Sequence, residues 1–536
     1  MKILKYLVAF GAVASLTTGC IKEELPTSYV SNEQMAESPA ALVNGMNAWL
    51  TTFNTMGLAG EQHYDFGWPG ICMGTDALTP DVAVTDYGYD NGFLNWRGVT
   101  PQLSQEGEAP RFFWNFCYSL INMANTLIGQ IDPENMSTTQ QEYLGQALVY
   151  RAMAYFHLAR VFEYKGTEHG VWDGLSVPIV DENTSELMGR RNPRVETDKL
   201  YDELILPDLQ NAVKYLEGYT RPAKNKVDQA VAYGMLARVY LQREQWKDAE
   251  EAATKAIELS GATPLTEAQW MSPTTGFNDI STPAWMWGII VTADNRVVTT
   301  GICNFVSFMA PEATYGYSAA GGWSSAKQID AALFAKIPDT DWRKRSWVNP
   351  DREKYPYSYY QTTLDKKTWE NSIQDYTGFK FRPGEGNGVT FSVGSVADFP
   401  LMRVEEMYLI QAEAAGMQNL SRGKQLLESF VQTYRNPSFR SAASDGKGLQ
   451  DEIFLQRQIE FWGEGIIMFD YKRLDKPQLK GYAGTNHFPE CRYNSPDGNA
   501  PWTTLPLPLA EVSANTILKD QQNPDPVLYR GTLWRQ

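Results

Sequence analysis

VDQAVAYGMLARVYLQREQWKDAEEAATKAIELS, residues 227–260, is the stretch that decides the fold of this chain. Small residues at Ala237, Ala249 and Ala256 allow two antiparallel helices to approach closely, and Tyr240 fills the groove between them. A single helical hairpin cannot bury its apolar face alone, so this stretch predicts a stack of several hairpins.

The stretch also has the length of one tetratricopeptide repeat, which is about 34 residues. With Ala249 at the alanine of the repeat's second helix, Tyr233, Leu236, Ala237 and Tyr240 take the key positions of the first helix. We therefore predict a mainly α fold, in which a tetratricopeptide-like scaffold of helical hairpins carries a large, irregular, loop-rich ligand-binding region.

Apolar residues at helical spacing predict further helices on both sides of this hairpin. Ser137 or Thr138 is the expected N-cap of one of them. The predicted segments are residues 111–131, 137–164 and 198–218, a hairpin at 403–435 after helix returns at Leu401, and a helix at 449–474. The scaffold should thus occupy about 111–262 and 401–475.

Residues 263–400 have a different character from the predicted scaffold. Gly and Pro interrupt this segment, and it holds seven of the 16 tryptophans. A long irregular region in a compact protein is usually functional or disordered, and this one is too aromatic for disorder. Together with residues 60–105, it is the predicted ligand-binding part of a single domain at residues 38–536.

The first residues read MKILKYLVAFGAVASLTTGC and predict an export signal. Two lysines precede an apolar run of about ten residues, which is too short to span a bilayer. Residues 1–19 resemble a lipoprotein signal, with Cys20 as the acylated first mature residue before a flexible leader at 20–37. The usual signal has Leu three positions before the cysteine, whereas here Leu16 lies four before. An ordinary secretory signal is the alternative.

Composition excludes several classes of function. The formal net charge is -16 and no basic run occurs, which disfavours nucleic-acid binding. The cysteines after Cys20 are too widely spaced for CxxC metal sites, so scattered buried thiols are expected, with an incidental disulfide as the alternative. We expect no cofactor. The one faint metal signal is the oxygen-rich run Asp86, Asp90 and Asn91 before Gly92, a weak match to a calcium loop.

Several segments in order resemble the SusD/RagB family of outer-membrane nutrient-binding lipoproteins. They are WNFCYSLINMAN (114–125), YRAMAYFHLARVF (150–162), LMRVEEMYLIQAEAAG (401–416), QRQIEFWGEGIIMFDYKRLD (456–475), PLPLAEV (506–512) and QQNP (521–524). The acidic residues behind Cys20 resemble the surface-export signal of Bacteroidetes lipoproteins. The likeness covers nearly the whole mature chain.

The resemblance implies a lid over a TonB-dependent, SusC-like outer-membrane transporter, to which the protein delivers large nutrients, most often oligosaccharides. The protein would be lipid-anchored on the cell surface and would do no chemistry of its own. Two other binding roles are open: capture of peptides or glycoproteins by the same architecture, and a pure scaffold that has no soluble ligand.

A surface glycoside hydrolase is the enzymatic alternative. Arg457, Glu460 and Glu464 are expected on one helical face, and paired carboxylates can drive glycoside hydrolysis. The same spacing also suits intrahelical salt bridges, continued by Asp470 and Arg473, and this structural interpretation is favoured. We therefore predict no catalytic residues and no enzyme.

Glycan binding rests on exposed aromatic rings, because an aromatic face stacks on the C–H face of a sugar ring while polar neighbours bind its hydroxyl groups. Two predicted loops offer this mixture, at residues 68–97 and 315–323. The predicted ligand-binding residues are Trp96, Tyr315 and Trp323, then Trp68, Tyr89, Asn91 and Asp76.

Overall fold

A computed structural model describes residues 38–53, 63–84, 99–164, 174–322, 325–498 and 500–529. Its N-terminal half is helical. The helices there are α3 (Pro39–Trp49), α4 (Trp68–Ala77), α6 (Glu108–Ile128), α7 (Thr138–Phe162), α8 (Glu186–Gly189), α9 (Thr197–Leu200), α10 (Leu206–Tyr215), α11 (Gln229–Gln242) and α12 (Trp246–Ser260). The predicted signal at 1–19 and leader at 20–37 lie outside the described residues.

The C-terminal half mixes short helices with one further group of long ones. Its helices are α13 (Glu267–Trp270), α14 (Arg296–Thr299), α15 (Phe305–Met309), α16 (Ala331–Lys336), α17 (Lys366–Ser372), α18 (Phe391–Gly394), α19 (Val404–Gln418), α20 (Leu420–Tyr434), α21 (Gly446–Glu460), α22 (Ile467–Arg473) and α23 (Leu509–Ala514). The strands are β1 (Val82–Val84), β2 (Trp285–Ile289), β3 (Lys327–Ile329), β4 (Phe399–Arg403), β5 (Gln478–Leu479) and β6 (Asn494–Ser495).

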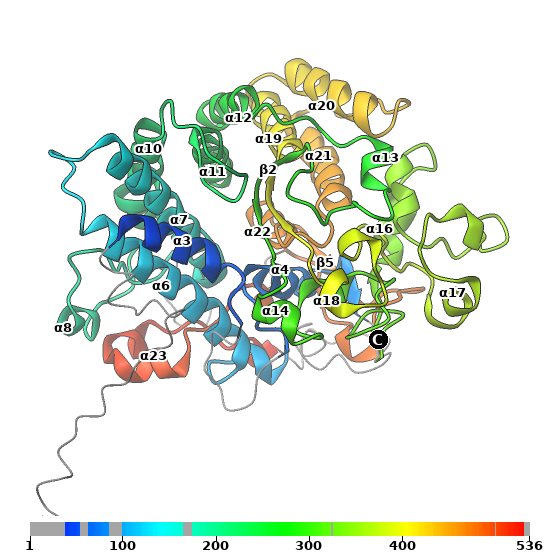
Figure 1. The fold of residues 1–536 in the computed structure, drawn as a ribbon, viewed down its shortest axis with the longest axis horizontal. Helices are drawn as coiled ribbons and strands as arrows, with labels where there is room; N and C mark the ends of the chain where they lie inside the picture. The colour runs from blue at the N-terminus through cyan, green and yellow to red at the C-terminus, as the bar shows by residue number, and fades with distance from the viewer. Residues whose placement is uncertain are drawn as a thin grey trace, which may run out of the picture.

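The long helices form the predicted stack of hairpins. Neighbouring helices pack in the order α6, α7, α10, α11, α12, α19 and α20, and Figure 1 shows them following an arc across the molecule. Ala237, Ala249 and Ala256, the small residues of the predicted hairpin, are all fully buried. The mainly α, tetratricopeptide-like prediction is therefore confirmed.

Residues 261–403 interrupt this stack. α12 packs directly on α19, although these residues separate the two helices in the sequence. β2 and β4 pair antiparallel near the two ends of the interruption, with Ile289 opposite Phe399. The loop-rich region is thus an insertion between two consecutive helices of the scaffold, held at its base by a strand pair.

Two sequence predictions near the C-terminal scaffold are wrong. Leu401 lies in strand β4, and helix begins at Val404. Residues 449–474 form two helices, α21 and α22, because Gly463 and Gly465 between them have φ of 81° and 77°. A Cβ on Gly465 would lie 2.4 Å from the Cα atom of Cys72, so this close backbone approach requires glycine.

The four cysteines after Cys20 are free and buried, as the sequence predicted. The N-cap of α7 is also confirmed: Ser137 and Gln140 form a capping box, in which the Gln140 N–H donates to Ser137 Oγ at 3.3 Å and the Ser137 N–H donates to Gln140 Oε1 at 2.9 Å.

Replacing Ser137 by Ala should lower the free energy of unfolding by about 1 kcal/mol, because one helix N–H then has only water as its partner. Urea unfolding of the variant measures the loss. Ser429→Ala, at an exposed position within α20, is the matched control and should change little. Equal stability of both variants would show that the cap does not contribute.

Candidate functional site

The strand pair β1–β3 brings the two predicted ligand loops together. Val84, the last residue of β1, pairs with Lys327, the first residue of β3. Residues 85–98 leave the pair at this end, and residues 323–324 precede it at the same end. His63 and Tyr317 make a second link through a hydrogen bond between the imidazole and the phenol. Two segments more than 200 residues apart in the sequence therefore begin and end side by side.

A tightly held turn presents Tyr315. The N–H and Oγ1 of Thr314 both donate to the carbonyl of Gly388, at 2.6 and 2.9 Å. Gly316 has φ of 65°, and a Cβ there would lie 2.3 Å from Cβ of Ser307. Only glycine suits both conditions, so the turn that carries the Tyr315 ring is fixed by its sequence.

A buried ion pair and an aromatic stack hold this turn in place. Arg382 contacts Glu312 at 2.8 Å, and both side chains are wholly buried. Glu312 also accepts a hydrogen bond from the Thr363 N–H at 2.8 Å. Tyr317 stacks on Phe308 with ring centroids 4.4 Å apart. The turn is thereby fixed to the rest of the inserted region.

Tyr315, Val389 and Phe391 form an apolar surface, here called the Tyr315 surface. The rings of Tyr315 and Phe391 meet edge to face, with centroids 6.5 Å apart. Val389 directly follows Gly388 and is 78% exposed, while Phe391 is 42% exposed. Burial raises the pKa of Tyr315 to about 12, so its phenol is un-ionised at neutral pH. Such a surface can stack on a ligand but offers it no ionised group.

The structure places Trp68 and Asp76 elsewhere. Trp68 begins α4, and its half-buried ring packs against Phe116 and His157 at 6.0 and 5.2 Å between centroids. Asp76 is buried, and its carboxylate accepts a hydrogen bond from the Gly465 N–H at 3.0 Å. Burial raises the pKa of Asp76, against that hydrogen bond. Its position favours a structural role over the predicted contact with ligand.

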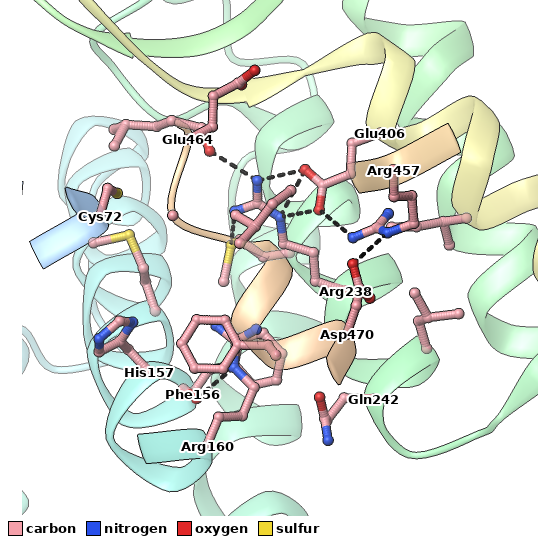
Figure 2. A pocket seen from close by; sticks show the side chains of 18 of the residues that line it. Cys72, Phe156, His157, Arg160, Arg238, Gln242, Glu406, Arg457, Glu464 and Asp470 are labelled. Atoms are coloured by element: carbon pink, nitrogen blue, oxygen red, sulfur yellow. Dashed lines mark hydrogen bonds and ion pairs between the residues drawn. The ribbon is translucent and has the colours of Figure 1, made fainter. Parts of the chain in front are cut away.

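Trp68 also lines a cavity of about 50 Å³, with room for a few water molecules. Figure 2 shows its wall: Arg238 faces Glu406, and Arg457 lies between Glu406 and Asp470. Arg238 Nη2 and Arg457 Nε donate to Glu406 and Asp470 at 2.6 and 2.7 Å. The carboxylates that line this cavity, Glu406, Glu464 and Asp470, are all paired with cations, so none of them is a free base.

Arg160 lines the same cavity without a carboxylate partner among the described residues. Its guanidinium is sandwiched between the rings of Phe156 and Phe469, 3.7 and 3.6 Å from their centroids. Its Nε donates to the Phe156 carbonyl at 3.1 Å. The sandwich ties α7 to α22 through a cation–π contact on each face.

Glu460 and Glu464 do not share a helical face, so this prediction is wrong. α21 ends at Glu460, and Glu464 lies in the break before α22. Arg435 binds Glu460 through two nitrogens at 2.8 and 2.9 Å, and Arg343 and Arg403 add bonds of 2.9 and 3.0 Å.

The surroundings of both carboxylates oppose acid catalysis. Burial alone would raise the pKa of Glu460, but the guanidinium groups of Arg435, Arg403 and Arg343 outweigh it and hold the pKa well below its usual value. A general acid needs a raised pKa and access to the substrate. Glu464 is paired with Lys380 and Arg403. The two carboxylates belong to a structural ion network, but its partners come from other segments of the chain, so the favoured prediction of intrahelical salt bridges is wrong in its geometry.

Several predicted residues lie outside the described residues: Cys20, Tyr89, Asn91, Trp96 and Trp323, together with Asp86 and Asp90 of the calcium-like run. Their roles stay predictions. Of the predicted ligand residues that the structure describes, Tyr315 lies on the exposed apolar surface, whereas Trp68 and Asp76 do not.

Sequence reasoning missed Val389 and Phe391. In the sequence they are two apolar residues in a Gly-rich segment, and no periodicity marks them as exposed. It also missed a cavity of about 270 Å³ beside the run YPYSYY, at residues 355–360. The density of tyrosines in that run was a signal that could have found it.

The described residues contain neither a metal-binding cluster nor a membrane-spanning helix. No group of three or more His, Cys, Asp or Glu residues there could hold a metal ion. None of the helices it contains is both long enough and apolar enough to cross a bilayer.

A stack of α-helical hairpins with a loop-rich region inserted between two of its helices is the architecture of SusD-like proteins. Two family models match the chain in order. One, described as "Starch-binding associating with outer membrane", matches residues 70–241, and the other, described as "SusD family", matches residues 307–525. The chain belongs to the SusD/RagB family, which confirms the resemblance found in the sequence.

Known relatives agree with this assignment. A SusD-like protein of Bacteroides ovatus (strain ATCC 8483) is 22% identical over 404 residues, which are 70% of this chain and 68% of that protein. A SusD-like carbohydrate-binding protein from Bacteroides vulgatus ATCC 8482 superposes with a TM-score of 0.71 at 22% identity, over 91% of this chain and 98% of that one. A laminarin-binding SusD-like protein gives 0.61 at 17%, over 92% and 100%.

Proposed function

We propose that this protein captures a glycan outside the cell and delivers it to a TonB-dependent, SusC-like transporter in the outer membrane. The observation that carries the proposal is the Tyr315 surface, because it exposes apolar and aromatic side chains in the inserted region. Its turn is linked to the segment that enters β3, since the Ser325 N–H donates to the Tyr317 carbonyl at 3.1 Å. Trp323 precedes Lys327 by four residues, and Tyr89 follows Val84 by five. We assign these rings, with Trp96 and Asn91, to the same binding surface.

The family assignment supports a carbohydrate as the ligand. One of the two matching models is described as starch-binding, and two structural relatives are a SusD-like carbohydrate-binding protein and a laminarin-binding SusD-like protein. Laminarin is therefore the first polysaccharide to test on this chain.

Binding without chemistry is the second part of the proposal. The best paired carboxylates in the sequence, Glu460 and Glu464, are neutralised by buried cations and lie within the scaffold. We expect the ligand to be released unchanged, and product analysis on every bound glycan checks this. Release of shorter glycans by the pure protein, abolished in Glu464→Gln, would contradict it.

Anchoring is the third part. We assign Cys20 as the lipid-bearing first residue of the mature chain, which would hold the protein on the outer face of the outer membrane. The family description, which names association with the outer membrane, supports this location. Metabolic labelling with a fatty acid, abolished in Cys20→Ala, tests the anchor.

Replacing both Tyr315 and Phe391 by Ala should weaken glycan binding roughly tenfold to a hundredfold, because an aromatic contact at a binding site is worth about 1–3 kcal/mol. Calorimetric titration of the mature chain with laminarin, and with other neutral polysaccharides that it binds, measures the loss. Tyr315→Phe should bind like the wild type, since the stacking face is kept.

Leu259→Ala, which removes an exposed apolar side chain from α12, is the matched control and should leave affinity unchanged. Wild-type affinity in the Tyr315 and Phe391 double variant would show that the ligand binds elsewhere. Competition by peptides that displaces every bound glycan would assign the site to peptides.

A further inference from the structure

A large groove lies on the scaffold, away from the Tyr315 surface. It has a volume of about 930 Å³, within the range of ligand sites, and it runs between α3, α6, the segment at 178–192 and α23. Figure 1 shows α3, α6, α8 and α23 together on the left, whereas α18, which carries Phe391, lies to the right of centre.

The floor of the groove is the outer face of α6. Asn115, Ser119 and Asn122 lie on it at spacings of four and three residues, so they form one row along successive turns. None of the three side chains makes a hydrogen bond to any described residue, and all are half-buried or exposed. The row offers amide and hydroxyl groups, each able both to donate and to accept.

Aromatic rings flank this row. Trp49 and Tyr118 are half-buried, and both line the groove. Trp49 Nε1 donates to the Phe116 carbonyl at 3.0 Å, which fixes the indole. Tyr118 lies 4.6 Å from Trp114 between ring centroids. Ring surface next to polar groups that both donate and accept is the combination that a sugar ring requires.

The walls are fixed by hydrogen bonds before any ligand arrives. Tyr118 donates to the Pro178 carbonyl at 2.7 Å, which joins α6 to the opposite segment. Asn515 Nδ2 donates to the Asn192 carbonyl at 2.6 Å, which joins the C-terminal end of α23 to that segment. A groove that is already formed loses little entropy when it orders a ligand.

The charges along the groove favour a neutral ligand. Arg190 pairs with Glu186 at 2.6 Å. The other carboxylate that lines the groove is Glu511, and burial raises its pKa. Among the described lining residues every cation has a carboxylate partner, so no unpaired positive charge attracts a polyanion. The apolar Leu187 and Met188 are strongly exposed on α8, but they lie beside the groove and do not line it.

We infer that this groove is a second binding site for a neutral oligosaccharide, held by the Asn115–Ser119–Asn122 row and the rings of Trp49 and Tyr118. The inference rests on the proposed function for the nature of the ligand, but it assigns that ligand a surface other than the Tyr315 surface. Two sites on one chain would hold a long polysaccharide more firmly than either site alone.

The test is calorimetric titration of the mature chain with laminarin-derived oligosaccharides and with the best binder from an array of neutral glycans. The groove variant is Asn115→Ala with Asn122→Ala; Asn115 is half-buried and Asn122 exposed, and Ala is a strong helix former, so the fold should be kept. Gln425→Ala with Ser429→Ala, on the exposed face of α20, is the matched control.

We expect two ligands per wild-type chain, and one in the groove variant, whose affinity at the lost site falls roughly tenfold or more. The Tyr315 and Phe391 double variant should lose the other ligand, and the α20 control should lose neither. One ligand per wild-type chain, lost with Tyr315 and Phe391 but unaffected by the groove variant, would overturn the inference and leave the proposed function intact.

Failure of the wild type to bind any neutral glycan would overturn both. Unchanged glycan binding in the groove variant, together with loss of a co-purifying transporter, would assign the groove to a protein partner and likewise overturn the inference.

Discussion

Replacing Glu460 by Gln is expected to lower the free energy of unfolding by about 3–5 kcal/mol, the cost of removing one partner from a buried ion network. Glu460 is wholly buried and accepts hydrogen bonds from Arg343, Arg403 and Arg435. Without its charge, three guanidinium groups in the core share fewer counter-charges. Urea unfolding, followed by the fluorescence of the 16 tryptophans, measures the change.

Glu258→Gln is the matched control. Glu258 pairs with Lys255 at 2.9 Å on an exposed face of α12, so water replaces the lost partner and little change is expected. Equal effects of the two substitutions would show that the Glu460 network does not stabilise the fold.

The contribution of Glu460 to the free energy of unfolding should also depend on pH. The folded-state pKa of Glu460 lies well below the unfolded value of about 4.3, so its contribution is fully present above pH 4.3 and is lost as pH falls through the folded pKa. Between these two values the wild type should lose about 1.4 kcal/mol per pH unit from this group, and the variant should not. The difference between the two proteins should therefore narrow in acid and stay constant between pH 5 and 8.

Replacing Gly423 by Ala should have the second-largest effect, about 3 kcal/mol of lost stability. α19 and α20 cross at Gly416 and Gly423, and a Cβ on Gly423 would lie 2.3 Å from the Cα atom and 2.6 Å from the nitrogen of Gly416. These are backbone atoms, so no rotamer change can relieve the clash. The two helices must move apart and lose packing along their length.

Gly189→Ala serves as the control, because Gly189 lies in α8 and a Cβ there meets no atom within 4 Å. That substitution should leave stability unchanged or slightly higher, since Ala is the better helix former. A thermal unfolding midpoint for Gly423→Ala within 1 °C of the wild type would contradict the close helix crossing.

Most of the scaffold could be predicted from the sequence because its rules are local. Helical periodicity located α6, α7 and the α11–α12 hairpin to within about three residues, and Ser137 marked the start of α7. The errors fell at residues 401 and 461–466, where tertiary contacts override periodicity. There β4 pairs with β2, and Gly465 presses against Cys72.

The candidate site could be predicted only in part. Tyr315 was predicted to contact ligand because it is an aromatic residue in a Gly-rich loop, and it lies beside exposed apolar side chains. Val389 and Phe391 join it through hydrogen bonds between Thr314 and Gly388, which are 74 residues apart in the sequence. Asp76 looked like a polar loop residue, but α4 buries it against Gly465.

The sequence by itself determined the helical hairpins and the family, because spacing, capping and short motifs depend on neighbouring residues; the export signal stays a prediction. Only the tertiary structure decided that α12 packs directly on α19 across the loop-rich residues 261–403, and that arginines from three other segments neutralise Glu460. It also decided that α6 leaves a polar row open to a groove. Exposure and charge pairing depend on which segments fold against one another, and no local pattern encodes that choice.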